Sequence, residues 1–195
     1  EIGVQAFAGC TSLESLNLNN VIKLNDGAFL ACSKLTNIEL NNVEYLGFQA
    51  LSSINVSEIV LSDSIKYISE TAFASNYMQT VFKDKDGNIN GKVNDYILLD
   101  DGVLYTITEN GKYMLHSYPT GKQDTEYEVL FGTVRIEEYA GYLNPYITKV
   151  IFPDTLEIIG NMCFYGCDKL KTVEFNSTIA PVLEGTASIP DIEYE

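Results

Sequence analysis

An acidic segment centred on a glycine is the first place where residue types and spacing could do chemistry. Residues 84–90 read Asp-Lys-Asp-Gly-Asn-Ile-Asn, and alternate oxygen-bearing side chains around a Gly bend follow the pattern of a calcium-binding loop. In that register the first ligand position is Phe82 and the twelfth is Val93, and neither side chain can coordinate a cation. We therefore expect an Asp-Gly turn here, with no metal and no cofactor.

The single histidine is the second candidate for chemistry. His116 lies in the middle of an expected strand over 113–117, with no recognisable nucleophile motif beside it. We expect His116 to be an exposed residue on the surface of a hairpin. The acidic side chains are spread over turns and strand faces without a distinct carboxylate pair, so the sequence offers no catalytic residues and predicts a chain that is not an enzyme.

The four cysteines lack the Cys/His spacing of a structural zinc site. Cys10 and Cys32 occupy equivalent positions in successive repeats, so a disulfide is geometrically conceivable. Ile54 and Asn76 fill the same position in the next two repeats, which favours small buried side chains instead. We expect all four, including Cys163 and Cys167, to be free, packed thiols.

Composition excludes several classes of partner. The 195 residues carry 12 basic and 27 acidic side chains, for a formal charge of −15, and 46% of residues are hydrophobic. This balance is typical of a folded domain and argues against binding to nucleic acid or to an anionic membrane. No apolar run is long enough to cross a bilayer, so we expect no direct membrane insertion. Because the chain opens at Glu1-Ile2-Gly3, we expect a processed chain or a piece of a longer one.

The elements that must position these residues are repeats of about 22 residues. Six segments, beginning at residues 12, 34, 55, 77, 146 and 169, carry apolar residues at the first, fourth and sixth positions of a leucine-x-x-leucine-x-leucine pattern. Five of them are regular: Leu13/Leu16/Leu18, Leu35/Ile38/Leu40, Val56/Ile59/Leu61, Ile147/Val150/Phe152 and Leu170/Val173/Phe175. The fourth has Met78 and Val81 but Lys83 at the sixth position, which indicates a degenerate end.

A second motif precedes each of these segments. Small-then-aromatic pairs such as Ala6-Phe7 and Cys163-Phe164 follow a shorter apolar stretch, for example residues 21–24. We therefore expect each unit to contain a strand, a polar turn, a return segment and a short helical turn that carries the small-then-aromatic pair. Since one unit cannot bury its own apolar side, we expect the units to stack into an α/β solenoid with a parallel β-sheet of at least five short strands.

The unit Ile-Gly-x-x-Ala-Phe-x-Gly-Cys at residues 2–10 returns at residues 159–167 as Ile-Gly-Asn-Met-Cys-Phe-Tyr-Gly-Cys. This unit resembles the BspA-type leucine-rich-repeat family of bacterial surface proteins. The resemblance covers residues 2–82 and about 133–177. It implies a right-handed leucine-rich-repeat stack at the cell surface or outside the cell, and binding to host matrix proteins or to other bacteria.

Residues 83–132 interrupt the repeats. Asn110-Gly111 between residues 103–107 and 113–117 is a strong hairpin signal, because both residues tolerate positive φ. We expect four regions: repeats over 1–82, a β-hairpin insertion over 83–132, repeats over 133–177, and a C-terminal cap or linker over 178–195.

The strand side chains that point outward are the candidate ligand-binding residues. Between the fourth and sixth strand positions stand Asn17, Glu39, Val60, Phe82, Ile151 and Glu174. Leucine-rich repeats usually bind partners on this open strand face, and an apolar centre with a polar rim has the appearance of a binding patch. The favoured alternative is that the insertion, which leaves the stack next to Phe82, folds over the apolar residues and covers them.

The sequence therefore predicts a non-enzymatic surface or secreted repeat protein that binds a protein ligand, either a host matrix protein or a bacterial surface protein. The alternative is an accessory binding or spacer module of a larger secreted enzyme or cell-wall protein. Neither the ligand nor the oligomeric state follows from the residues.

Overall fold

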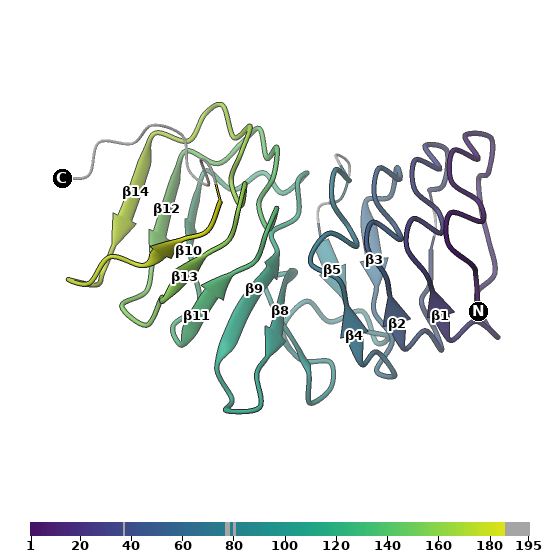
Figure 1. Cartoon of the computed structure of the whole chain (residues 1–195), viewed down its shortest axis with the longest axis horizontal. Coiled ribbons are helices and arrows are strands. Elements are labelled where there is room, and N and C mark those ends of the chain that lie inside the picture. The colour runs from purple at the N-terminus through teal and green to yellow at the C-terminus, as the bar shows by residue number, and fades with distance from the viewer. Residues whose placement is uncertain (37, 77–78, 80, 186–195) are drawn as a thin grey trace.

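The computed structural model describes residues 1–36, 38–76, 79 and 81–185. The chain winds into a stack of coils that runs from the N-terminus at the right of Figure 1 to the C-terminal coils at the left. The solenoid expected from the repeats is confirmed. Of the residues named above, Met78 and the tail beyond residue 185 lie outside the described part.

The leucine-x-x-leucine-x-leucine segments contribute short parallel strands, in two separate groups. The first group pairs β3 (Glu58–Val60) with β5 (Val81–Lys83), and Ile59 stands opposite Phe82. The second group is a three-stranded sheet in the order β10 (Glu126–Glu128), β12 (Lys149–Phe152) and β14 (Thr172–Phe175). The expected single sheet is thus divided between β5 and β10. Strand β10 falls inside residues 83–132, yet it pairs with β12 in the manner of a repeat strand.

The return segments form a second set of parallel strands. On the N-terminal side these are β1 (Lys23–Leu24), β2 (Tyr45–Leu46) and β4 (Tyr67–Ile68). On the C-terminal side they are β11 (Thr133–Ile136), β13 (Ile158–Ile159) and β15 (Val182–Leu183). In β1 and β2 the second residue points inward, so Leu24 and Leu46 have no exposed surface.

The expected hairpin is confirmed and joins this second set. Strands β8 (Val103–Ile107) and β9 (Tyr113–Ser117) pair antiparallel around Asn110-Gly111, and Gly111 has a φ of 72°. Strands β6 (Gly91–Lys92) and β7 (Ile97–Asp100) add to the β8 edge, while β9 pairs in parallel with β11. The hairpin therefore extends the sheet of return segments instead of lying over the outward face of the other strands.

The described residues contain no α-helix, so the helical part of the α/β expectation is wrong. Most Ala-Phe turns are bounded on both sides by residues of left-handed backbone conformation, as at Gln5 (φ 52°) and Gly9 (φ 71°). The N–H groups of Gln5, Phe7 and Gly9 donate to carbonyls of the next coil, at N···O distances of 2.7–2.9 Å. A helix would need those N–H groups for its own carbonyls, so bonding between coils replaces bonding along a helix.

The interior consists of two hydrophobic clusters separated by the hairpin. One gathers residues of the N-terminal coils and Leu104, and the other gathers residues of the C-terminal coils with Val103 and Tyr105. Neighbouring residues of β8 thus pack against different clusters, and all five of its residues are buried. The hairpin lies between the N-terminal and C-terminal coils (Figure 1). Each face of β8 therefore packs against one of the two clusters.

Side chains at the repeat position that the cysteines share form hydrogen bonds between neighbouring coils. The Cys32 thiol donates to the Phe7 carbonyl at 3.1 Å, and the Asn76 amide donates to the Leu51 carbonyl at 2.9 Å. Cys32, Cys163 and Cys167 are buried thiols that form no disulfide, as expected. Cys10 is free but exposed, so its expected burial is wrong, because the first coil has a neighbour on only one side.

Candidate functional site

The outward column of the strands is the candidate site, and pairing between strands defines its order. Val60 stands opposite Glu39 on one side and Lys83 on the other, and Ile151 stands between Glu128 and Glu174. With the earlier coils, the column comprises Asn17, Glu39, Val60, Lys83, Glu128, Ile151 and Glu174. We call the surface formed by these residues and their outward neighbours the open strand face.

Phe82 does not belong to this face, which corrects the expected stripe. Its side chain has no exposed surface and packs edge-on against Phe73, with ring centroids 5.1 Å apart. The correct register follows from Asn76: Leu13 and Leu35 lie three residues after the cysteines of their units, and Gln79 lies three residues after Asn76. Gln79 is 1% exposed, as a first-position residue should be, so Phe82 takes the buried fourth position.

Two residues that sequence reasoning missed replace Phe82 on the open strand face. Lys83 follows directly from the corrected register. Glu128 lies 23 residues before Ile151, which is the same step that separates Ile151 from Glu174. The repeat period would have found Glu128 if the strand after Thr125 had been recognised as a repeat strand.

Ion pairs between adjacent coils frame the face. Lys83 Nζ lies 2.7 Å from Glu58 Oε1, and Lys149 Nζ lies 2.7 Å from Glu174 Oε1. The hydrogen bond from Lys149 to the Glu174 carboxylate raises the pKa of the lysine. Surface pairs of this kind add little stability, so their main effect is to fix side-chain positions on the face.

The apolar part of the face is small. Val60 and Ile151 are both half-buried, one in each group of strands. The alternative in which the insertion covers them disagrees with the structure, because the hairpin strands pair into the other sheet. What remains accessible is two aliphatic side chains among charged neighbours.

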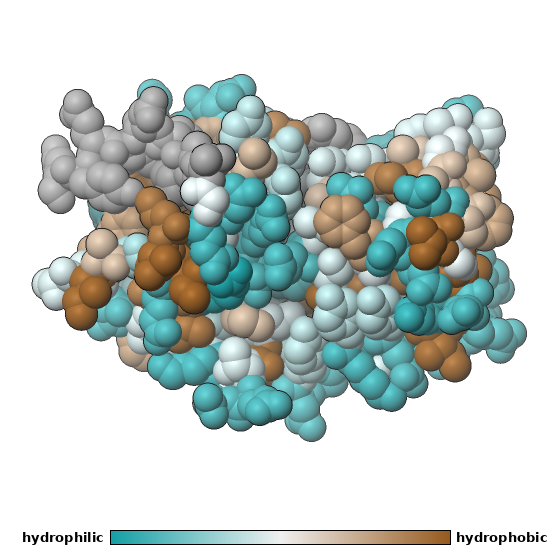
Figure 2. Space-filling model, in the orientation of Figure 1, coloured by the Kyte–Doolittle hydropathy of each residue, from teal (hydrophilic) through white to brown (hydrophobic). Residues whose placement is uncertain are grey.

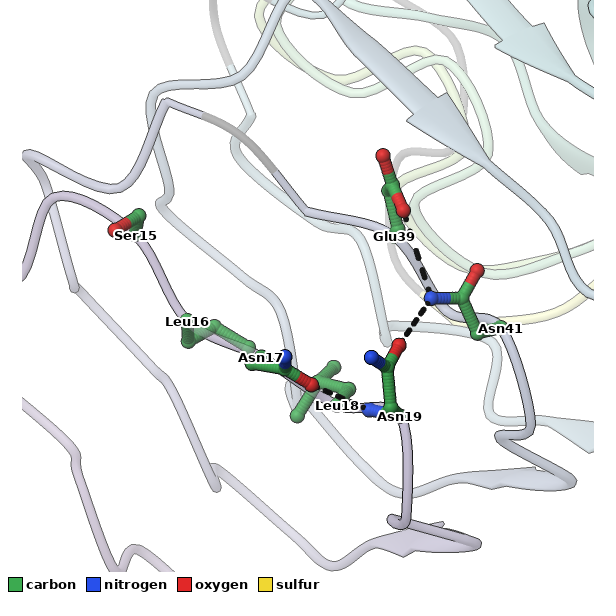
Figure 3. A pocket seen from close by; sticks show the side chains of 7 residues that line it. All are labelled: Ser15, Leu16, Asn17, Leu18, Asn19, Glu39 and Asn41. Carbon is green, nitrogen blue, oxygen red and sulfur yellow. Dashed lines mark hydrogen bonds between the residues drawn. The ribbon is translucent and has the colours of Figure 1, made fainter.

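A hollow of about 210 Å³ opens at the N-terminal end of the open strand face (Figure 3). Its walls are Ser15, Leu16, Asn17, Leu18 and Asn19 from the first coil, and Glu39 and Asn41 from the second. A chain of hydrogen bonds orders the amides: the Asn19 N–H donates to Asn17 Oδ1 at 2.9 Å, and Asn41 Nδ2 donates to Asn19 Oδ1 at 2.7 Å. Two of the sequence-predicted residues, Asn17 and Glu39, thus meet at one hollow.

His116 is buried, with 2% of its surface exposed, so its expected position on the hairpin surface is wrong. The N-terminal coils cover that face of β9, and the ring lies edge-on to Phe73 with centroids 6.4 Å apart. Burial lowers the pKa of His116 to about 4, while the nearby backbone of Ile68 and Ser69 opposes the shift. The imidazole is therefore neutral at pH 7 and has no access to a substrate.

The remaining chemical candidates also have structural explanations. Asp84 Oδ1 accepts the N–H groups of Asp86 and Asn88, at 2.9 and 2.8 Å, and Asp84 Oδ2 accepts from Asn88 Nδ2 at 2.8 Å. These bonds lower the pKa of Asp84 and close an Asp-Gly turn. Burial raises the pKa of Cys167 to about 11, which makes its thiol a poor nucleophile. Over the described ranges, no group of three or more His, Cys, Asp or Glu residues is placed to hold a metal.

The face seen in Figure 2 carries hydrophobic groups mainly toward the two ends of the stack, while hydrophilic groups cover most of its middle. Over the chain as a whole, the exposed large hydrophobic side chains include Ile22, which is 55% exposed, and Phe48, which is 52% exposed. Scattered exposed apolar side chains are normal on a folded protein and do not by themselves mark a site.

Stacked coils, parallel strands on leucine-x-x-leucine-x-leucine segments and an ordered outward column define the class of leucine-rich-repeat proteins. The family model of the BspA type leucine rich repeat region matches residues 1–92 and 134–186 in six copies. The chain belongs to this family. No curated protein matches it.

Three solved structures share the fold. A leucine rich cell surface protein from Faecalibacterium prausnitzii is 25% identical, with a TM-score of 0.79, and the match covers 88% of this chain and 44% of that one. A leucine-rich repeat protein from Eubacterium ventriosum is 16% identical, with a TM-score of 0.64 and coverage of 91% and 57%. The pneumococcal vaccine antigen PcpA is 19% identical, with a TM-score of 0.56 and coverage of 82% and 50%. The chain thus spans about half the length of each.

Leucine-rich repeats of this kind are typically binding modules, and the family is one of bacterial surface proteins. A helix long and apolar enough to span a membrane does not occur in the part of the chain that the structure describes.

Proposed function

We propose that this chain is a non-enzymatic protein-binding module at the surface of a bacterium or secreted from it, and that the open strand face is its contact surface. One observation carries the proposal: Val60 and Ile151 stay accessible in the outward column, and each has one charged neighbour there, Lys83 or Glu174, that is held by an ion pair across adjacent coils. A small apolar centre with a polar rim is the usual composition of a protein interface.

The partner is a protein of the host matrix or of another bacterial surface, and the module acts in adhesion. Membership of the BspA-type family supports this, as does the description of the Faecalibacterium prausnitzii neighbour as a cell surface protein. Its extracellular place is inferred from the same similarities.

Capture by the immobilised chain, from host extracellular matrix and from neighbouring bacteria, identifies the partner. Its Kd is then measured for the chain and for the double variant Val60→Lys/Ile151→Lys. Because apolar anchors at the centre of a patch carry most of the binding energy, we expect affinity to fall about tenfold or more. The matched control is Ile22→Lys, which makes the same change at an exposed aliphatic residue beside β1.

Equal affinity of the chain and the double variant, with both melting cooperatively, would show that the partner binds elsewhere. Loss of affinity in the Ile22→Lys control alone would show that the partner binds the return segments instead. Either result rejects the open strand face as the contact surface.

A further inference from the structure

The hollow at the N-terminal end of the open strand face has the dimensions for one side chain of a partner. Its volume is about 210 Å³. A folded segment cannot enter such a space, whereas the terminal group of a long side chain can. The seven lining residues bring one carboxylate and no cationic group.

Hydrogen bonds within the hollow decide which atoms remain for a ligand. Asn41 Nδ2 is directed to Asn19 Oδ1 at 2.7 Å and makes a longer contact of 3.5 Å with Glu39 Oε2 (Figure 3). Because both contacts use the nitrogen of Asn41, its Oδ1 is left as an acceptor. The Glu39 carboxylate and Asn41 Oδ1 are therefore acceptors at the hollow, beside the amide nitrogens of Asn17 and Asn19, and a ligand with several N–H donors can bond to these oxygens.

Glu39 differs in its partners from two other carboxylates of the face, whereas Glu128, like Glu39, has no ion pair within the described residues. Glu58 and Glu174 are each 2.7 Å from a lysine nitrogen, so their charge is compensated. Within the described part of the chain, Glu39 has no ion pair, and its one side-chain hydrogen bond is the long contact with Asn41. The negative charge at the hollow is thus available to an incoming cation.

We propose that the hollow receives the guanidinium group of an arginine side chain from the protein partner, with the Glu39 carboxylate as its counter-ion. The guanidinium is planar and offers five N–H donors in a fixed fork, so it can bind the carboxylate and the amide oxygens together. The net charge of −15 favours the approach of a cation. This inference rests on the proposed function, because it names the chemistry of a partner on the open strand face.

A titration of the ¹⁵N-labelled chain with L-argininamide tests the inference. We expect saturable shifts of the side-chain amide resonances of Asn17, Asn19 and Asn41. Glu39→Gln should weaken this binding about tenfold or more, because it removes a charge-assisted hydrogen bond. The matched control is Glu109→Gln at the exposed tip of the hairpin, which removes the same charge and should leave affinity unchanged.

Three results would overturn the inference: shifts that do not saturate, equal affinity in the Glu39→Gln variant, or the same shifts with glucose, which carries no charge. The amide spectrum also reports whether each variant is folded. If argininamide fails while Val60→Lys/Ile151→Lys still loses the captured partner, the hollow is wrong and the open strand face stands. If argininamide binds through Glu39 but no face variant affects the partner, the proposed function is wrong.

Discussion

Lowering the pH from 7 to 4 is expected to cost the native fold about 3 kcal/mol through His116 alone. The imidazole is buried, and its pKa is lowered to about 4 from the ordinary 6.5. The unfolded chain therefore binds this proton at a higher pH than the folded chain does. Between these values the free energy of unfolding falls by about 1.36 kcal/mol for each pH unit, and the pKa difference of roughly 2.5 gives about 3 kcal/mol.

The sign follows from the direction of the shift. Because the folded pKa is the lower one, the neutral imidazole is the native form, and its contribution is fully present above pH 6.5. That contribution is lost as the pH falls toward 4, and no further loss comes from His116 below this value.

Urea denaturation between pH 4 and pH 8 measures the effect, with His116→Leu as the variant. Leucine keeps an apolar side chain beside Phe73 and cannot titrate, so the difference between the two pH profiles isolates His116 from the 27 acidic side chains. The profiles should diverge by about 3 kcal/mol between pH 6.5 and pH 4. Parallel profiles would refute the reasoning, since they would mean that the folded chain binds the proton as easily as the unfolded chain.

Three further substitutions test the packing. Phe82→Ala should lower the free energy of unfolding by about 3 kcal/mol, the usual cost of deleting a buried aromatic ring. An unchanged urea midpoint would contradict the burial of Phe82. Gly141→Ala should cost about 1–3 kcal/mol and lower Tm, because a Cβ there would lie 2.4 Å from the Phe164 ring, whereas Gly3→Ala has open space and should cost less. Asn144→Ala should destabilise by about 2 kcal/mol in urea melts, since this buried amide donates to three backbone carbonyls and accepts two N–H groups, and a loss below about 0.5 kcal/mol would contradict that role.

Local residue patterns were enough for much of the fold. The repeat period placed Ile59 and Val150 inward, because stacking units bury equivalent positions, and both have no exposed surface. Asn110-Gly111 predicted the hairpin turn because tolerance of positive φ is a local property of these residue types, and Gly111 adopts it. The same repeat period predicted part of the candidate site: five of the expected residues have outward positions, namely Asn17, Glu39, Val60, Ile151 and Glu174.

Tertiary structure decided what the period and local preference could not. Phe82 was expected in the outward column but lies in the core, because the fourth unit is offset by one residue. A shift of one residue turns a strand side chain to the other face of the sheet. His116 is buried because β9 joins the sheet of return segments and the N-terminal coils cover its second face. No helix forms at Ala6-Phe7 because the N–H groups of the turn bond to the next coil, a partner that exists only once the coils are stacked.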